Sequence, residues 1–373
     1  MNISALYETL LEKAEAHGFP IRGGLDIDSA QGDLALHVER YDQWLAQGFD
    51  GKMAYLRRGR DRRADPRLVF PKAQSIFCVA APYRRAPLGD GNGGPRYARY
   101  IQGRDYHDRI LERLERLLQE ARADHPSLEW KICVDTSAVL ERSWATLAGL
   151  GWIGKNKTLI HPKHGSYLFI AEALLSAPLG RGPSPLPNYC GNCTRCLDAC
   201  PTRAFSSSGA LDSRRCISYW TLENRGALEI SDEEREKIGP WVAGCDICQE
   251  VCPFNIKPSR EAQPEFEIQG ESAASVDWLS LLRETPDQYR ERVRDSALNR
   301  VKPEQFSRNL AIVFANAGPE AWTPDAREEA VRRSCEETDP AARAEWERTV
   351  SLLTSLQTSS RKDELEPYPR PGK

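Results

Sequence analysis

Eight cysteines in one short stretch constrain this chain more than any other feature of its sequence. Of the eleven cysteines in 373 residues, eight lie between Cys190 and Cys252. The first four follow a Cys-x2-Cys-x2-Cys-x3-Cys-Pro pattern that ends at Pro201, which is the spacing found in bacterial ferredoxins. In such a run three thiolates hold one [4Fe-4S] cluster and the fourth reaches a second cluster. The spacing therefore predicts a chain that moves electrons one at a time.

The second cysteine run is incomplete. It ends at Cys252-Pro253, and Val242 stands where its first cysteine would fall. Cys216, between the two runs, is the nearby thiol free to take that role, and with it every thiol of the block is assigned. We expect cluster one on Cys190, Cys193, Cys196 and Cys252, and cluster two on Cys200, Cys216, Cys245 and Cys248. Crossed ligation of this kind would place the two clusters close together.

Zinc is the alternative for this block, because CxxC pairs also form four-cysteine zinc sites. The two Cys-Pro endings and the ferredoxin spacing favour iron–sulfur clusters. A disulfide scaffold is not favoured, because the other cysteines, Cys78, Cys133 and Cys335, are scattered along the chain. For each of these three we expect a small buried apolar residue.

Helix-like and strand-like segments alternate from about residue 40 to residue 180, which predicts an α+β or α/β domain. The expected strands are 75–81, 131–134, 158–160 and 167–174, and the expected helices are an N-terminal one, 108–122 and 139–150. Three alternating prolines, Pro183 to Pro187, indicate a boundary before the cysteines. We expect an α/β domain over 1–183, a ferredoxin-like two-cluster module over 184–258, a helical C-terminal appendage over 259–358 and a disordered tail over 359–373.

The composition is that of an ordinary globular protein. The net charge is −3, and no run of about 18 apolar residues occurs, so we expect no membrane helix. At the N-terminus the apolar residues are interrupted by Glu8, Glu12 and Glu15, which indicates an amphipathic helix rather than a signal peptide. We therefore expect a cytoplasmic protein, with a monomer as the default state.

Five motifs follow one another between residues 40 and 260. They are Arg104-Asp-Tyr-His107, Val134-Asp-Thr-Ser137 with Glu141-Arg142, Gly149-Leu-Gly-Trp-Ile-Gly-Lys-Asn156, Arg215-Cys-Ile-Ser218 and Gly244-Cys-Asp-Ile-Cys248. Together they resemble the epoxyqueuosine reductase family, and the resemblance extends far beyond the cysteine spacing. It implies a cobalamin-binding domain of nitroreductase-like type. It also implies an oxidoreductase that reduces the epoxide of epoxyqueuosine at the wobble position of tRNA, which gives queuosine in the last step of queuosine biosynthesis.

The implied chemistry accounts for the clusters. Removing an epoxide oxygen needs two electrons and a source of protons, whereas iron–sulfur clusters supply electrons singly and a cobalt corrinoid can accumulate them. The resemblance implies base-off cob(II)alamin with no histidine ligand from the protein, and an Asp-x-His-x-x-Gly motif is absent from the sequence. His107 is the alternative lower ligand, but its place at an expected helix start favours a structural hydrogen bond. An unidentified low-potential donor would supply the electrons.

Asp135 matches the general acid of the family. It ends an expected strand, where desolvation beside a corrinoid would raise the pKa of its carboxyl group. The alternative is that Asp135 caps a helix beginning near Ser137. Arg142 on that helix would face the substrate or its phosphates, or else be a solvated or salt-bridged side chain. The cobalamin contacts implied by the resemblance are Arg63, Ala98, Asp135, Lys155, Asn156, Leu159 and Ile170.

The glycine-rich run from Gly149 to Gly154 is not a dinucleotide-binding loop, because it follows an expected helix and such a loop must follow a strand. Glycine permits close approach of the backbone to another group. We expect this run to lie against the flat macrocycle of the corrinoid.

Two arginine-rich stretches could contact tRNA phosphates. The first is residues 56–67, and the second contains Arg290, Arg292, Arg294, Arg300, Lys302 and Arg308. Acidic residues are interspersed in both, so a solvated charged face is the alternative. A modified anticodon base would have to be flipped into the pocket. Tyr219, Trp220 and Trp278 are candidates for stacking on bases, with core packing as the alternative.

Two other functions fit part of the pattern. A reductive dehalogenase shares the corrinoid and the two clusters, but it normally carries a twin-arginine signal, and the Arg-Arg pairs at 57 and 62 are internal. An electron-transfer subunit of ferredoxin type would explain the cysteines. It would leave the roughly 180 residues before them without a role.

Overall fold

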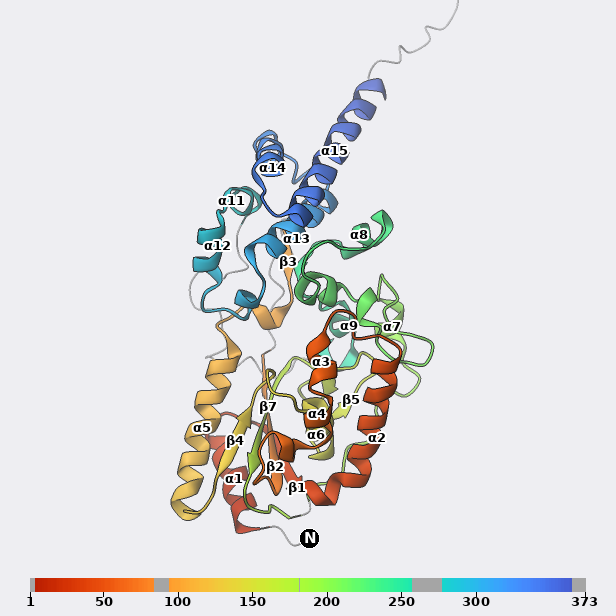
Figure 1. The fold of residues 1–373 in the computed structure, drawn as a ribbon. Helices are drawn as coiled ribbons and strands as arrows, with labels where there is room; N and C mark the ends of the chain where they lie inside the picture. Colours follow the sequence, from red (N-terminus) through yellow and green to blue (C-terminus); the bar gives the residue numbers. More distant parts are fainter. Residues whose placement is uncertain (1–3, 84–93, 181, 257–276, 364–373) are drawn as a thin grey trace, which may run out of the picture.

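The structure is a computed structural model that describes residues 4–83, 94–180, 182–256 and 277–363. A four-stranded sheet with its helices lies at the end of the molecule that contains the N-terminus, and helices α11 to α15 lie at the other end (Figure 1). The cysteine-rich segment joins the two, with the short helices α7 (Arg195–Asp198), α9 (Ile247–Glu250) and α10 (Pro253–Ile256).

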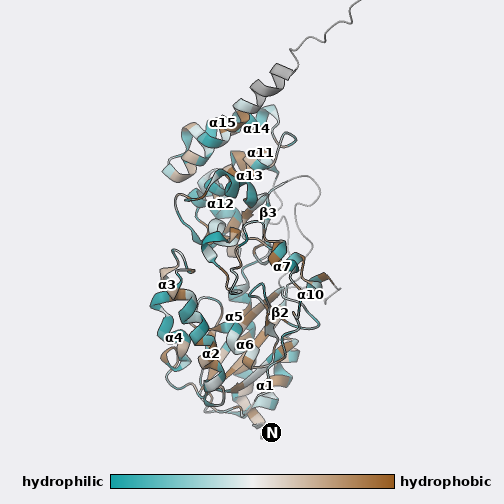
Figure 2. Cartoon of the chain, turned by 90° about the vertical axis from the view of Figure 1, so that its right-hand side faces the viewer, coloured by the Kyte–Doolittle hydropathy of each residue, from teal (hydrophilic) through white to brown (hydrophobic). Residues whose placement is uncertain are grey.

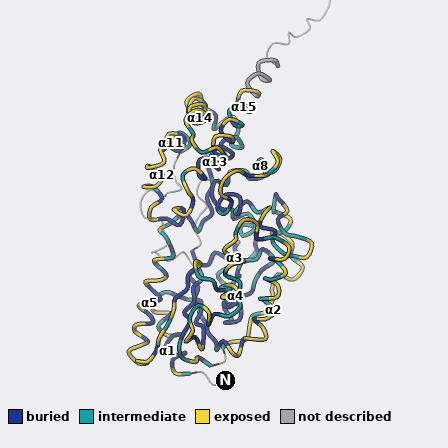
Figure 3. The backbone as a smooth tube through the Cα atoms, viewed as in Figure 1, coloured by how far each residue is buried: buried dark blue, intermediate teal, exposed yellow. Residues whose placement is uncertain are grey.

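The central sheet is antiparallel throughout, with strand order β1-β2-β7-β4. Its strands are β1 (Ile21–Asp26), β2 (Ser75–Pro82), β7 (Leu168–Leu175) and β4 (Trp130–Cys133). All eight residues of β2 are buried, because helices cover both faces of the sheet. In Figure 2 the strand labelled β2 has the brown colour of apolar residues, and in Figure 3 the interior of this end of the molecule is dark blue, the colour of buried residues.

Two helices cover each face of the sheet. On one face, α1 (Ala5–Ala16) and α5 (Tyr106–Asp124) share a core with the odd-numbered residues of β2 and β7. Leu114, Leu117 and Leu118 of α5 are fully buried, as its amphipathic sequence requires. On the other face, α2 (Ile27–Ala46) and α6 (Glu141–Leu147) pack on Cys78, Cys133 and their neighbours.

Short elements connect these layers. They are α3 (Ala54–Arg58), α4 (Arg60–Ala64), η1 (Pro66–Leu68), η2 (Arg99–Ile101), η3 (Ser213–Arg215), η4 (Tyr219–Glu223) and α8 (Asp232–Ile238). Two further pairs of short strands form, antiparallel β5 (Trp152–Ile153) with β6 (Leu159–Ile160), and parallel β3 (Arg96–Tyr97) with β8 (Trp241–Ala243).

The C-terminal helices share one hydrophobic core with the segment around the cysteines. The helices are α11 (Trp278–Arg283), α12 (Pro286–Val293), η6 (Ala297–Arg300), α13 (Pro303–Asn316), α14 (Pro324–Glu336) and α15 (Pro340–Asp363). This core also contains residues of β3, η4 and β8. Arg308 of α13 is 1% exposed and donates to the carbonyl oxygens of Trp220, Asn224 and Gly226. Those bonds tie α13 to the loop after the first cysteine run.

The expected strands and helices of the α/β domain are confirmed, with ends that differ by a few residues. Strand β1 and helix α2 were not expected, because β1 contains two glycines and an arginine, and α2 is polar along most of its length. Cys78 and Cys133 are buried as expected, but the expectation is wrong for Cys335, which is exposed on α14. Among the described residues, none of the helices combines the length and apolar character that a membrane span needs.

Candidate active site and cluster site

The thiols of the cysteine block act on one another's pKa in two overlapping groups. Burial is the main reason that the pKa of the Cys252 thiol is raised, and the thiols of Cys190 and Cys193 add to it. Burial raises the pKa of Cys196 in the same way, and Cys190, Cys252 and Cys193 contribute. The distant Cys252 therefore lies beside the first three cysteines, as the crossed assignment to cluster one requires.

The second group gathers around Cys248. Burial raises the pKa of Cys248, and Cys216, Cys196 and Cys200 contribute. The thiol of Cys216 contributes to the raised pKa of Cys245, and the thiol of Cys200 contributes to the raised pKa of Cys216. The contribution of Cys196 to Cys248 connects the two groups. In the described ranges no three His, Cys, Asp or Glu side chains converge on a single ion position. The cysteine spacing and the mutual effects of the thiols are the features that favour two clusters.

The β5–β6 hairpin of the α/β domain contacts both cysteine runs. Trp152 of β5 packs with Cys252, and its indole Nε1 lies 3.5 Å from Sγ of Cys190. Lys155 Nζ donates to the carbonyl oxygens of Gly191 and Cys193, at 2.7 and 2.9 Å. Asn156 Nδ2 donates to the carbonyl oxygen of Cys248, at 3.5 Å.

Lys155 and Asn156, predicted to contact cobalamin, therefore contact the cluster loops in this structure. Two of the preceding glycines lie close to Ile160 of β6. A Cβ at Gly151 would lie 2.3 Å from the carbonyl oxygen of Ile160. A Cβ at Gly154 would lie 2.4 Å from the side chain of the same residue. These glycines accommodate the chain's own hairpin.

Asp135 follows β4 in a conformation that few residues adopt. Its φ of 52° is in the left-handed region, where aspartate and asparagine are among the best-tolerated residues after glycine. Its backbone N–H donates to Oε1 of Glu141 at 2.5 Å. Helix α6 begins at Glu141 with Leu140 at its N-cap, so the alternative that Asp135 caps this helix is wrong.

The side chain of Asp135 forms a three-membered hydrogen-bonded array with residues at the start of α5. Its Oδ2 lies 3.4 Å from Nε2 of His107, and Nδ1 of His107 lies 2.6 Å from Oδ1 of Asp105. Asp105 also accepts from the backbone N–H of His107 as the N-cap of α5. The expected structural hydrogen bond of His107 is thus present, and it leads to Asp135.

The array fixes where protons reside. Burial works against a charged His107, but hydrogen bonds to Asp105 and Asp135 raise its pKa to about 9. The hydrogen bond from His107 holds the pKa of Asp135 below its ordinary value. Desolvation beside a corrinoid was expected to raise the pKa of Asp135, but in the free chain the hydrogen bond and the charge of His107 outweigh desolvation and lower it. At neutral pH the proton of the pair is on the imidazole.

Residues from the C-terminal region and from α3 complete the surroundings of Asp135. Arg300 of η6 forms an ion pair with Glu223, and Asp135 is among the groups that raise the pKa of Arg300. Tyr55 is 45% exposed, yet burial raises its pKa to about 12. Ser296 Oγ donates to the carbonyl oxygen of Ile101 at 2.8 Å, which attaches this region close to His107.

The remaining residues predicted to contact cobalamin or tRNA lie on different elements of the α/β domain. Arg142 is exposed to solvent, and partial burial nevertheless lowers its pKa. Its guanidinium donates to the carbonyl oxygen of Lys157. Leu159 packs on the same face of the sheet as Ile170. Arg63 on α4 has a buried Nη1 without a hydrogen-bond partner in the described structure.

Ala98, also a predicted cobalamin contact, is 2% exposed, and a Cβ at Gly244 would lie 2.5 Å from its Cβ. It therefore packs under the second cysteine run. The aromatic candidates for base stacking differ in burial. Tyr219 and Trp220 are core residues, whereas Trp278 is half-buried against that core.

Most arginines of the two basic stretches have acidic partners. In the first stretch, Arg57, Arg60 and Arg67 pair with Asp50, Asp42 and Asp28, whereas Arg58 and Arg62 are exposed. In the second, Arg290, Arg292, Arg294 and Arg300 pair with Asp287, Glu284, Glu291 and Glu223. A charged, ion-paired surface therefore describes half of the arginines in the first stretch and most of those in the second.

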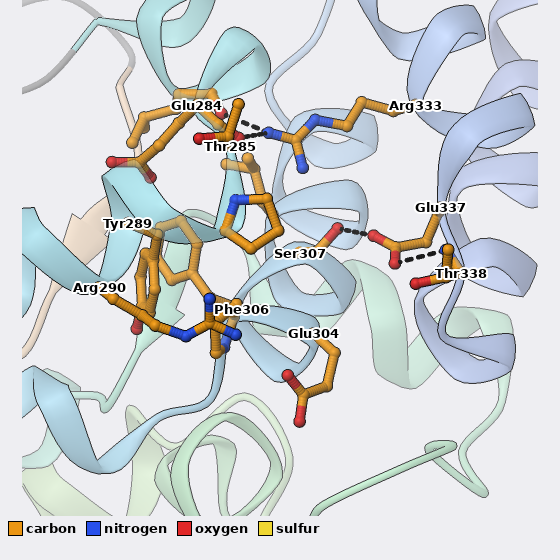
Figure 4. Close-up of a pocket in the computed structure, with 14 residues that line it drawn as sticks. Glu284, Thr285, Tyr289, Arg290, Glu304, Phe306, Ser307, Arg333, Glu337 and Thr338 are labelled. Carbon is orange, nitrogen blue, oxygen red and sulfur yellow. Dashed lines mark hydrogen bonds between the residues drawn. The ribbon is translucent and has the colours of Figure 1, made fainter.

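A cavity of about 160 Å³ lies elsewhere, among the C-terminal helices (Figure 4). Its walls include Glu284, Tyr289, Phe306 and Arg333. The Arg333 guanidinium donates to backbone carbonyl oxygens of this region, including that of Leu282 at 2.7 Å. Arg290 of the second arginine-rich stretch lines it, but none of the predicted catalytic, cofactor-binding or cluster residues does, so we do not assign the chemistry to this cavity.

Sequence reasoning missed several groups around Asp135. Glu141 appeared only as part of a motif, and Tyr55, Glu172 and Glu223 were not considered. A signal was available for Glu172, because it is the one acidic residue in the otherwise apolar run of β7. The place of Arg300 beside Asp135 could not be inferred, because it depends on the packing of η6 against η2.

Two family models match the chain. One is described as a 4Fe-4S double cluster binding domain and matches residues 189–255, and the other, epoxyqueuosine reductase QueG, matches residues 63–136. The first establishes the ferredoxin-like two-cluster module, and with it the iron–sulfur clusters, over the zinc alternative. The second includes both His107 and Asp135.

Curated and solved proteins give the same result. Epoxyqueuosine reductase of Synechococcus sp. (strain RCC307) is 37% identical over 310 residues, which is 82% of this chain and 93% of that protein. An epoxyqueuosine reductase solved with an epoxyqueuosine-modified tRNA-Tyr stem loop is 29% identical, with a TM-score of 0.73 over 94% of this chain and 99% of that one. A Bacillus subtilis epoxyqueuosine reductase, with its catalytic aspartate loop swung out of the active site, is 28% identical, with a TM-score of 0.72 over 93% and 98% of the two chains. The chain belongs to the epoxyqueuosine reductase family.

Proposed function

We propose that this protein reduces the epoxide of epoxyqueuosine at the wobble position of tRNA to give queuosine, with electrons delivered by two [4Fe-4S] clusters. The observation that carries the proposal is the array of Asp105, His107 and Asp135 beside a hairpin that contacts both cysteine runs. Arg142 links the two, because it acts on Asp135 and donates to the carbonyl oxygen of Lys157 in the hairpin. We place the substrate recess between the array, Arg142 and the hairpin, with the proton source and the electron source on its two sides. The epoxyqueuosine reductases similar to this chain match it over most of its length.

The eight cysteines fit the two clusters in the crossed assignment. Cys190, Cys193, Cys196 and Cys252 would hold the first cluster, and Cys200, Cys216, Cys245 and Cys248 the second. The grouping of the thiols supports this division. A low-potential one-electron donor, still to be identified, would reduce the clusters.

Cobalamin is the proposed second cofactor, in the base-off form and on a domain of nitroreductase-like type. The unpartnered, buried Nη1 of Arg63 fits a ligand that carries amide or phosphate oxygens, because buried N–H groups need an acceptor. Asp135, Arg142, Leu159 and Ile170 would line the recess, with Ala98, Lys155 and Asn156 on the cluster side. When bound, cobalamin supplies the two-electron chemistry that single iron–sulfur clusters lack.

Asp135 is the residue we propose to deliver the proton to the departing oxygen. In the free chain the proton lies on His107, and Asp135 would pass it on within their hydrogen-bonded pair. The catalytic aspartate loop described for the Bacillus subtilis structure supports this role. Such acid catalysis typically accelerates a step by about 10²–10⁴-fold.

The tRNA would be held by groups around the recess, with Arg142 near the modified nucleotide. The exposed Arg58 and Arg62 on α3 and α4 are further candidates for phosphate contacts. We place the protein in the cytoplasm, where tRNA is modified, and expect it to act as a monomer. A reductive dehalogenase is the alternative with the same cofactors, and the similarity to tRNA-modifying enzymes disfavours it.

The test is the nucleoside composition of tRNA from a strain that lacks the gene. Mass spectrometry of the digested tRNA should show accumulation of epoxyqueuosine and loss of queuosine, and the intact gene on a plasmid should restore queuosine. Queuosine at its normal level in the deletion strain, without epoxyqueuosine, would exclude the function.

A further inference from the structure

A buried carboxyl group in the central sheet has no role in the function proposed above. Glu172 of β7 is fully buried, and neither of its carboxyl oxygens has a hydrogen-bond partner in the described structure. Its register neighbours are Cys78 on β2 and Cys133 on β4. An isolated buried carboxylate is strongly disfavoured, so this group is expected to carry a proton.

Glu141 connects Glu172 with the proposed active site. Glu141 Oε1 accepts the backbone N–H of Asp135 at 2.5 Å. Burial raises the pKa of Glu141 to about 8, and the charge of Asp135 adds to the effect. Burial also raises the pKa of Glu172 well above its ordinary value, with Glu141 and Asp135 contributing. Helix α6, which begins at Glu141, packs on Cys78 and Cys133, the register neighbours of Glu172, and Glu141 itself contacts Asp135. Glu141 is therefore the carboxyl group that connects the sheet with Asp135.

The other titratable groups around them do not supply a neutralising partner for Glu172. Burial raises the pKa of both flanking thiols, Cys78 and Cys133, so they are neutral. Arg142 and His107 are the cations that act on Glu141. Both lie on the recess side, and neither is among the groups that shift Glu172.

The balance of the reaction makes a second proton necessary. Reduction of the epoxide breaks both carbon–oxygen bonds, forms the carbon–carbon double bond and consumes two electrons. The oxygen leaves as water, so two protons are consumed as well. The pair of His107 and Asp135 holds one proton at neutral pH, and it must be refilled within the same turnover.

We propose that Glu141 and Glu172 form a proton reserve that refills Asp135 after its first proton transfer. The proton of Glu141 moves to the carboxylate of Asp135, which delivers it to the departing oxygen as the second proton. Glu172 is protonated and therefore adds no negative charge next to Glu141. It holds the proton that lies farthest from the substrate among the three carboxyl groups. Both act through Asp135 and are positioning residues, and the inference rests on the proposed function.

Glutamine substitutions test the reserve with little change in shape. Glu141→Gln keeps a carbonyl oxygen that can accept the backbone N–H of Asp135, but it has no acidic proton to give. Glu172→Gln replaces a neutral acid by a neutral amide of the same size. Glu129→Gln is the matched control, because Glu129 precedes β4 and is exposed, with Lys72 as its partner.

The first measurement is single-turnover reduction of an epoxyqueuosine-containing tRNA stem loop by the reconstituted, reduced holoenzyme across a pH series. We expect the wild-type rate to fall above about pH 8, where Glu141 loses its proton. Glu141→Gln should be at least about tenfold slower below this pH and lack that decline, with unchanged stem-loop affinity, and Glu129→Gln should match the wild type. A rate and pH profile for Glu141→Gln equal to those of the wild type would overturn the proposal, since solvent would then refill Asp135.

The second measurement does not depend on turnover. Infrared spectra of the same holoenzyme at pH 7 should contain the carbonyl band of a protonated, buried carboxyl group that is lost in Glu172→Gln and retained in Glu129→Gln. An identical band in Glu172→Gln would overturn the proposal, because Glu172 would then be ionised. Wild-type protein that shows the band but does not convert the stem loop would contradict the proposed function instead.

Discussion

Oδ2 of Asp135 lies 3.4 Å from Nε2 of His107, and the opposite ring nitrogen lies 2.6 Å from Asp105. An imidazole held between two carboxylates retains its proton at neutral pH, and the proton on Nε2 is the one that faces Asp135. The side chain of Asp135 is 48% exposed, compared with 32% for Asp105, so Asp135 is the partner that substrate can reach more readily. The geometry thus gives the array a direction, from the start of α5 toward the recess.

Asp135→Asn should abolish the acid without disturbing the backbone. Asparagine tolerates the left-handed conformation of this position, which alanine adopts at greater cost. We expect turnover of epoxyqueuosine-containing tRNA to fall by about 10²–10⁴-fold, with iron content and stem-loop affinity unchanged. Anaerobic kinetics and iron analysis check this. Turnover within a factor of two of the wild type would remove Asp135 from the reaction.

Asp105→Asn should change the titration of His107. The pKa of the ring, about 9 in the native protein, should move down toward its ordinary value of 6.5. A raised histidine pKa stabilises the fold fully below pH 6.5, and this contribution is lost as the pH rises through about 9. The wild type should therefore lose stability relative to Asp105→Asn across that window. Ring-proton NMR and urea unfolding at several pH values measure the two effects, and an unchanged ring titration would contradict the array.

Cys216→Ser tests the replacement of the missing cysteine in the second run. The variant should lose the second cluster and retain about four of eight irons per chain. Cys335→Ser is the control, because Cys335 is an exposed, isolated thiol on α14. Iron analysis and low-temperature electron paramagnetic resonance after anaerobic reconstitution distinguish the two. Full iron content in Cys216→Ser would show that another residue is the fourth ligand.

Arg308→Met should destabilise the attachment of the C-terminal helices. The buried guanidinium donates to three backbone carbonyl oxygens, which methionine would leave without partners. We expect the free energy of unfolding to fall by about 3 kcal/mol. Arg332→Met, at an exposed ion-paired site on α14, should change it by less than about 0.5 kcal/mol. Urea unfolding at equal cluster content checks both, and equal effects would contradict the structural role of Arg308.

The cysteine block was the part of the site that sequence could predict in most detail. Ligand spacing is a local property, and Cys216 followed from counting thiols against Val242 in a broken repeat. The strand that precedes Asp135 was also predictable, because Lys131 to Val134 has the apolar character of a buried strand. These features depend on neighbours in the sequence.

The surroundings of Asp135 were less predictable, because they depend on contacts between distant segments. Arg300 reaches this region through the packing of η6 on η2, and no spacing in the sequence indicates that contact. The pKa of Asp135 was expected to be raised because burial alone was considered. Its hydrogen bond with His107, 28 positions away, reverses the direction.

The most direct test of the account is conversion of substrate by the purified protein. Anaerobically reconstituted protein with both clusters and cobalamin, a chemical one-electron reductant and epoxyqueuosine-containing tRNA should yield queuosine, quantified by mass spectrometry of the nucleosides. The account predicts loss of epoxyqueuosine matched by an equal gain of queuosine, and no conversion by Asp135→Asn under the same conditions. Epoxyqueuosine left unchanged by protein whose clusters are demonstrably reduced would contradict it.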